Sequence, residues 1–258
     1  MQDEADRLHQ GLRRSFEALV DRIEDARLED RIGYRLVICP RVPFPGLNGV
    51  WAEDAVAPDV VDEVEAAIAE VEALGGPCWI EVRAGRTPAV ELLTRRLGFT
   101  DEEAIPGMVL RPSELVDVGD SKLTFSRAHD AARLSVAASV GAAGFEVPRE
   151  LIEALYTPRV AALPGLSIYV AYAHGHPVST AMAWAGDGAV GIYNVATPPE
   201  HRGRGYGRAV TSKAVADGFA AGADLAWLQA SQLGLPVYRA MGFRQVETYL
   251  VLGRPSIT

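Results

Sequence analysis

The 258-residue sequence predicts an α+β fold composed of two related halves. Amphipathic helical segments alternate with short β-rich segments, and three consecutive β-rich runs in the second half indicate an antiparallel meander. The two halves also repeat several short phrases in the same order. Apolar residues make up 48% and charged residues 23% of the chain, as in globular domains with buried cores.

In the first half we expect helices and strands in alternation. Apolar residues three and four positions apart predict helices over 3–29, 58–74 and 87–98. Short apolar runs bounded by proline and glycine predict strands over 35–39, 47–54 and 78–84, and two short strands near Phe99 and over 108–110.

The second half is expected to be richer in strands. The meander strands are predicted over 166–173, 178–185 and 189–196, and further strands over 122–128, 224–231 and 246–252. Helical segments are predicted over 130–141, 148–156, 205–221 and 236–241.

The internal repeat suggests two copies of one supersecondary unit. Trp79 and Trp227 lie in equivalent strands, and each is followed by a proline that opens a helix. The helices end in the phrases LGF and MGF, and the halves close with VLRPS and VLGRPS. We therefore place the boundary near 115–120 and expect domains over 1–117 and 118–258.

The net charge of −9 argues against a nucleic-acid-binding protein, since neutralising phosphates requires a basic surface. The charge is uneven, with a net of −11 over residues 1–118 and +2 over 119–258. No apolar run is long enough to span a bilayer and the first residues are unlike a signal peptide, so we expect a cytoplasmic protein without a membrane partner. Cys39 and Cys78 lack metal-ligand spacing and are expected to be buried thiols, and no metal site is predicted.

The most informative segment is the glycine-rich loop before the helix at 205–221. Gly203, Gly205 and Gly207 allow the backbone to approach a ligand closely, and the free amides at a helix start favour an anion. Neighbouring arginines add positive charge. The segment lacks the Lys-Ser/Thr of a P-loop and the GxGxxG spacing of a Rossmann fold, and it therefore indicates a diphosphate-binding loop of another kind.

This segment resembles the GNAT superfamily of N-acetyltransferases. RGRGYG at 202–207 matches the family's R/Q-x-x-G-x-G/A motif, and the order of meander, loop, helix, strand, short helix and strand matches as well. Ser231, Tyr238 and Gly242-Phe243 fit a later family motif. The resemblance covers 119–258. Together with the repeat, it implies an α/β sandwich-like pair of tandem GNAT-like domains, each a mixed, largely antiparallel sheet flanked by helices.

The resemblance implies acetyl transfer from acetyl-CoA, the acyl donor substrate, to an amine. The backbone of Val195 and Thr197 is expected to bind pantetheine and the acyl carbonyl, and the amides from Gly203 to Arg208 are expected to bind the pyrophosphate. The full set of expected donor-binding residues is Val195, Ala196, Thr197, Arg202, Gly203, Arg204, Gly205, Tyr206, Gly207 and Arg208.

Two residues are expected to act on the reaction. Tyr238 matches the tyrosine that often protonates the departing CoA thiolate, and a positioned hydroxyl makes that departure easier. Ser231 is expected to bind pantetheine or to orient a water. The general base is left open among Glu146, Glu200, His174, His176 and His201, with a solvent-relayed base as the default.

The first half of the sequence differs from the family pattern at the position of the glycine-rich loop. After GVWAED, residues 55–58 lead directly into a helix whose start is acidic, so the glycine-arginine segment is missing. Val90 or Thr94 occupies the position of Tyr238. We therefore expect a degenerate copy that does not bind CoA.

The predicted function is an acetyl-CoA-dependent N-acetyltransferase that acts on a small-molecule amine by direct attack, as a monomer or homodimer. Two alternatives stay open, namely a non-catalytic acyl-CoA-binding regulatory module and a protein or peptide N-acetyltransferase. The acceptor is expected to be selected by residues 129–160 together with Trp184 and Tyr193, and Phe145 lies in that segment.

Overall fold

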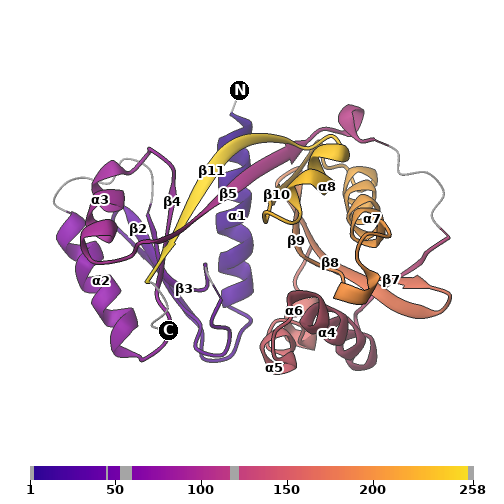
Figure 1. Ribbon diagram of the computed structural model, residues 1–258, viewed down its shortest axis with the longest axis horizontal. Coiled ribbons are helices and arrows are strands. Elements are labelled where there is room, and N and C mark those ends of the chain that lie inside the picture. Colours follow the sequence, from indigo (N-terminus) through magenta and orange to yellow (C-terminus); the bar gives the residue numbers. More distant parts are fainter. Residues whose placement is uncertain (1–2, 45, 53–59, 117–121, 255–258) are drawn as a thin grey trace. The chain divides into compact units, whose positions relative to one another are not determined.

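Figure 1 shows the computed structural model, which describes residues 3–44, 46–52, 60–116 and 122–254. The chain forms two compact units. Unit 1 contains residues 1–19 and 107–246, and unit 2 contains residues 20–106 and 247–258. The units therefore differ from the predicted halves, because each includes a segment from the other half of the sequence. The division into 1–117 and 118–258 stays a prediction about the repeat.

Unit 1 is built on a six-stranded sheet with the strand order β5-β10-β9-β8-β7-β6. Its strands are β5 (Asp101–Leu110, from Gly107 onward), β6 (Thr124–Arg127), β7 (Leu166–Ala173), β8 (His176–Gly186), β9 (Ala189–Ala196) and β10 (Leu225–Gln229). Neighbouring strands are antiparallel except β9 and β10, which run parallel. Its α-helices are α1 (Glu4–Val20), α4 (Ala131–Phe145), α5 (Arg149–Glu153), α6 (Pro158–Ala161), α7 (Tyr206–Ala220) and α8 (Leu235–Ala240).

Helices cover both faces of the unit 1 sheet. Because side chains alternate along β9, Val190 and Ile192 enter the buried cluster beneath α7, while Tyr193 points to the opposite face. On that opposite face, α1 packs over Trp227, and α4 packs over the end of β9. Gly11 of α1 is required for this packing, since a Cβ there would lie 2.7 Å from the Trp227 ring.

Unit 2 repeats the same plan with fewer elements. Its sheet has the order β1-β2-β3-β4-β11, from strands β1 (Arg27–Arg31), β2 (Tyr34–Ile38), β3 (Asn48–Ala52), β4 (Trp79–Arg83) and β11 (Arg244–Gly253, from Glu247 onward). Strands β3 and β4 run parallel and are linked by α2 (Val61–Ala73), as β9 and β10 are linked by α7. Helix α3 (Pro88–Arg96) follows β4 and packs on the same core.

The two units exchange their last strands. In unit 1, β10 pairs with β5, which comes from the first half of the sequence, and Trp227 faces Val109. In unit 2, β4 pairs with β11, which comes from the second half, and Trp79 faces Gly253. The repeated phrases VLRPS and VLGRPS begin at the ends of these exchanged strands.

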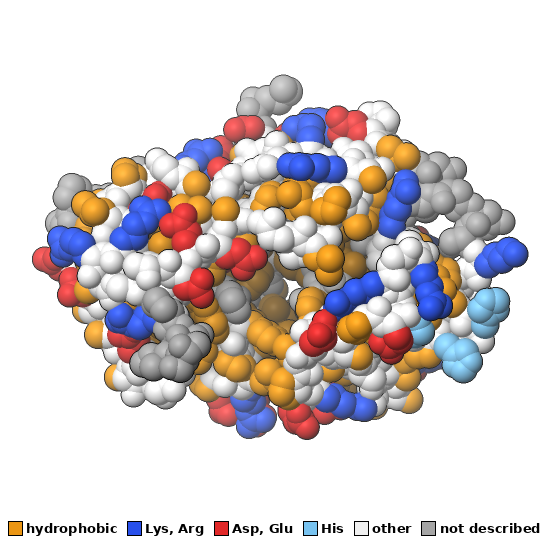
Figure 2. Space-filling view, in the orientation of Figure 1, with side chains coloured by type: hydrophobic (Ala, Val, Ile, Leu, Met, Phe, Trp, Pro, Cys, Tyr) orange, Lys and Arg blue, Asp and Glu red, His pale blue; other side chains and the backbone are white. Residues whose placement is uncertain are grey.

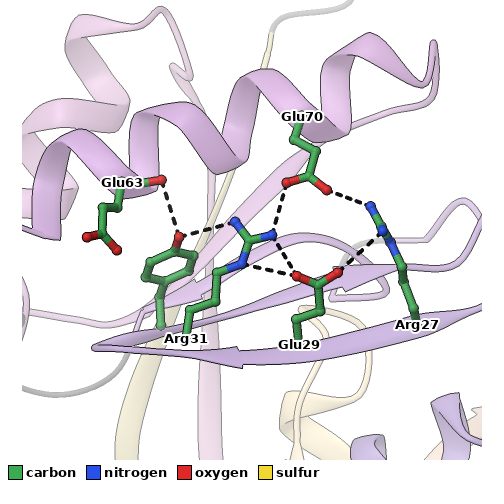
Figure 3. A network of polar contacts seen from close by, with 6 residues as sticks. Arg27, Glu29, Arg31, Glu63 and Glu70 are labelled. Carbon is green, nitrogen blue, oxygen red and sulfur yellow. Dashed lines mark hydrogen bonds and ion pairs between the residues drawn. The ribbon is translucent and has the colours of Figure 1, made fainter.

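The helix predicted over 3–29 was too long. Helix α1 ends at Val20, and residues 27–31 form the strand β1. The sequence of β1, RLEDR, has no apolar alternation. Its charged side chains are held by α2, because Arg27 and Arg31 lie 2.6 and 3.0 Å from the carboxylate of Glu70 and Arg31 also pairs with Glu29 (Figure 3).

The end of the first half also differs from expectation. Instead of two short strands near Phe99 and over 108–110, one continuous strand, β5, extends from Asp101 to Leu110. Cys39 and Cys78 are buried free thiols, as predicted, and burial raises the pKa of Cys39 to about 11 and that of Cys78 to about 12. Among the described helices, none has the length and apolarity of a membrane span.

Candidate functional site

The glycine-rich loop forms an anion-binding turn at the start of α7. Gly203 and Gly205 adopt φ angles of +74° and +79°, which only glycine adopts without strain. The first helix-bonded amide is that of Ala209, which donates to the Gly205 carbonyl at 2.9 Å. The amides of Tyr206, Gly207 and Arg208 come before it and so lack an acceptor within the helix. The turn thus presents free donors at the positive end of a four-turn helix.

The C-terminal end of strand β9, which precedes the glycine turn, is only partly paired with its neighbouring strands. Thr180 pairs with Ala196 and Met182 pairs with Tyr193, so Asn194 and Val195 together face Ala181 in a β-bulge. Asn194 accordingly has a φ of +46°. On the other side, pairing with β10 ends at Ile192 and Leu228. The β9 backbone from Tyr193 to Ala196 therefore has donors and acceptors that the β10 ladder does not use.

Ser179 and Thr197 hold the end of β9 in place. The Ser179 hydroxyl donates to the Ala196 carbonyl at 2.9 Å and lies 2.9 Å from the Thr197 hydroxyl. Thr197 in turn lies against the start of α7, since a Cβ on Gly207 would be 3.2 Å from its hydroxyl. These contacts bring the predicted residues Val195, Ala196 and Thr197 next to the glycine turn.

Ser231 and Tyr238 converge at the loop between β10 and α8. A Cβ on Gly234 would lie 2.7 Å from the Tyr238 ring and 3.3 Å from the Ser231 hydroxyl, so this glycine lets both side chains approach. The Ser231 hydroxyl accepts the Gly234 amide at 3.2 Å and caps the turn into α8. Tyr238 is 8% exposed and stacks edge-on against Phe243. Burial raises the pKa of Tyr238 to about 12, and its hydroxyl has no partner among the described residues.

The side chain of Arg202 contacts the protein around the loop. Its guanidinium donates to the carbonyls of Thr197 and Gly144, at 3.1 and 2.8 Å, and pairs with Glu146 at 2.9 Å. The side chain therefore ties the end of α4 to the loop. Its predicted role in binding the donor stays a prediction.

A basic cavity adjoins the turn on the side of β6 and β7. Its volume is about 300 Å³, and its lining includes Lys122, His174, Arg204 and Arg208 but no acidic residue. Figure 2 shows Lys, Arg and His side chains on the right-hand side of the view, over β7 and α7. Lys122 was not among the predicted site residues, because it lies in no motif.

The residues predicted as candidates for the general base differ in their exposure and contacts. His174 is exposed in the turn between β7 and β8, and His176 is exposed as the first residue of β8. Glu146 forms an ion pair with Arg202. His201 stacks on Tyr206 at 6.3 Å. Among the described residues, no group of three His, Cys, Asp or Glu side chains could hold a metal ion.

Of the residues expected to select the acceptor, Tyr193 is already engaged within unit 1. Its hydroxyl bonds to Ser15 of α1, and its ring stacks edge-on against Trp227 at 5.3 Å. The indole of Trp184 donates to the Pro164 carbonyl at 3.1 Å. Phe145, at the end of α4, is 41% exposed and remains accessible.

The comparisons with known proteins agree with this geometry. Residues 164–245 match the family model described as an acetyltransferase (GNAT) domain. No curated protein matches the chain. The chain is similar in structure to a GCN5-related N-acetyltransferase from Kribbella flavida. The two are 20% identical with a TM-score of 0.68, and the match covers 94% of this chain and 95% of that chain.

Two further solved structures have the same fold. A GCN5-related N-acetyltransferase from Sphaerobacter thermophilus is 16% identical, with a TM-score of 0.62 and 87% of this chain and 82% of that chain covered. A tandem GNAT protein from the clavulanic acid biosynthesis pathway is 12% identical, with a TM-score of 0.59 and 86% and 79% covered. The predicted resemblance is thereby confirmed: the chain has the GNAT fold, and its residues 164–245 match the acetyltransferase (GNAT) domain model.

Proposed function

We propose that the chain is an acetyl-CoA-dependent N-acetyltransferase that acetylates a small-molecule amine by direct attack. The observation that carries the proposal is the presence of three features together in unit 1. These are the free amides at the start of α7, the backbone at the end of β9 that β10 leaves unpaired, and the Tyr238 hydroxyl, which has no partner among the described residues. When bound, acetyl-CoA supplies an acetyl group activated as a thioester.

The residues of the loop fit a diphosphate. A Cβ at Gly203 or Gly205 would meet no atom within 4 Å, so the turn is open above its amides. The amides from Gly203 to Arg208 bind the pyrophosphate, with Arg204 and Arg208 adding charge. The backbone of Val195 and Thr197 binds the pantetheine arm and the acyl carbonyl, because β10 leaves this part of β9 unpaired.

Tyr238 acts as the general acid that protonates the departing CoA thiolate. With a pKa of about 12, its phenol stays protonated at neutral pH and can donate to sulfur as the C–S bond breaks. Ser231 positions this end of the site by capping the turn before α8. The amine gives up its proton to solvent, since Glu146 forms an ion pair with Arg202 and both His174 and His176 are exposed.

Unit 2 does not contribute a second donor site in this proposal. Val90 and Thr94, the residues at the position of Tyr238, are both fully buried in its core. The position of the missing glycine-arginine segment, 55–58, lies outside the described residues. The first copy is therefore proposed to be degenerate, with one donor site per chain.

Thiol release from acetyl-CoA tests the proposed function directly. We expect release in the presence of at least one member of a panel of polyamines, amino acids, aminoglycosides and peptides. The protein's own thiols do not interfere, because Cys39 and Cys78 are buried. Release with small amines supports the proposal, and release with peptides alone indicates a peptide N-acetyltransferase. CoA binding without release by any acceptor would contradict catalysis and favour a regulatory module.

A further inference from the structure

The basic cavity beside the glycine turn contains more positive charge than a diphosphate requires. The amides at the helix start already satisfy an anion of that kind. Arg204 and Arg208 lie in the loop and first turn, whereas Lys122 comes from the segment before β6 and His174 from the turn after β7. The cavity thus extends from the turn toward a second pair of elements. Its volume of about 300 Å³ is that of a small-molecule subsite.

Within the part of the chain that the structure describes, Lys122, Arg204 and Arg208 have no hydrogen-bond or ion-pair partner. Most of the 25 Lys and Arg side chains form ion pairs or hydrogen bonds. Among the described residues, those without one are Arg96, Lys122, Arg204, Arg208 and Arg239. Three of these line the one cavity, and the buried Nε of Arg208 is also unbonded. Like charges without counter-charges repel, so their convergence indicates an anionic ligand.

The proposed donor, acetyl-CoA, contains a second anionic group. Besides its diphosphate, CoA has a phosphate monoester on the ribose, one sugar away, and a monoester bears a charge of about −1.5 to −2 at pH 7. Lysine binds phosphate as a compact point charge, and charge-assisted bonds to phosphate are among the stronger polar contacts. Lys122 lines the same cavity as Gly205, Tyr206 and Arg208 of the turn, so a phosphate attached to the ribose is a candidate ligand for it.

Building on the proposed function, we propose that Lys122, together with Arg208, binds the ribose 3′-phosphate of CoA, so that the site distinguishes acetyl-CoA from acetyl-dephospho-CoA. Lys122 is then a specificity-determining residue for the donor. It does not touch the reacting thioester, and its loss should affect affinity without changing the chemistry.

Calorimetric titration of the full chain with both donors tests this assignment. We expect the wild type to bind acetyl-CoA about 10-fold more tightly than acetyl-dephospho-CoA, and Lys122→Met to reduce that ratio to about 2-fold by weakening acetyl-CoA alone. The matched control is Arg239→Met on α8, which removes another exposed, unpartnered cation outside the cavity and should keep the ratio of the wild type.

The outcomes separate this inference from the proposed function. An unchanged ratio in Lys122→Met, or a ratio lost in Arg239→Met, would overturn the assignment of the 3′-phosphate. Equal affinities of the wild type for the two donors would contradict this inference alone. Absence of binding of either donor would contradict the proposed function and the inference together.

Discussion

Tyr238→Phe is expected to lower kcat about 100-fold or more while leaving the Kd for acetyl-CoA within about twofold. The substitution removes a hydroxyl that has no partner among the described residues, and it keeps the ring that stacks on Phe243. The fold therefore loses no hydrogen bond, whereas the departing thiolate loses its donor. Steady-state kinetics and calorimetric titration measure the two quantities.

Tyr169→Phe provides the matched control. This tyrosine is also buried, but its hydroxyl bonds to Asp217 at 3.0 Å and lies on β7 rather than at the reaction site. It should keep the kcat of the wild type. A kcat of Tyr238→Phe within about threefold of the wild-type value would contradict the assignment of Tyr238 as the acid, since general acid catalysis contributes at least about 100-fold.

The pH profile provides a further test of the same residue. Burial raises the pKa of Tyr238 to about 12, so the protonated, donating form persists throughout the neutral and moderately alkaline range. We expect kcat/KM to rise with pH as the amine acceptor loses its proton, and to show no fall from Tyr238 up to pH values about one unit below that pKa.

The double variant Gly203→Ala/Gly205→Ala is expected to raise the Kd for acetyl-CoA at least about 10-fold. A left-handed conformation costs a residue with a Cβ about 1–2 kcal/mol, and the loop can relieve that cost only by turning its amides away from the ligand. Space is not the limiting factor, because a Cβ at either position meets no atom within 4 Å. Calorimetric titration measures the affinity, and thermal unfolding measures the stability.

Gly222→Ala separates backbone strain from loss of the site. Gly222 has a φ of +101° and equally open surroundings, but it follows the opposite end of α7. The Gly222→Ala substitution should lower the thermal stability about as much as each alanine of the double variant does. It should leave the affinity for acetyl-CoA unchanged. Equal affinity in the wild type and the double glycine variant would show that the turn does not bind the donor.

Much of the site could be predicted from local sequence. Alternate glycines before an apolar helix allow only a few backbone conformations, and both Gly203 and Gly205 have the left-handed φ that such a turn requires. The repeated phrases likewise predicted two sheets of the same plan. These features depend on residues close together in the chain.

Features that depend on distant partners escaped prediction. The charged strand β1 pairs with β2 along its full length, and its arginines form ion pairs with Glu70 of α2, more than 30 residues later. The loop motif also does not indicate that the side chain of Arg202 contacts Gly144 and Glu146 at a separate helix end. The exchange of β5 and β11 was not predictable either, because their similar phrases do not indicate which strand pairs with β10 and which with β4.

We propose that the glycine turn at the start of α7 is the single acetyl-CoA site of the chain, and calorimetric titration of the wild-type protein with acetyl-CoA measures this. We expect saturable binding of one acetyl-CoA per chain. Two molecules per chain would contradict the degeneracy of the first copy, and absence of binding would contradict the site itself.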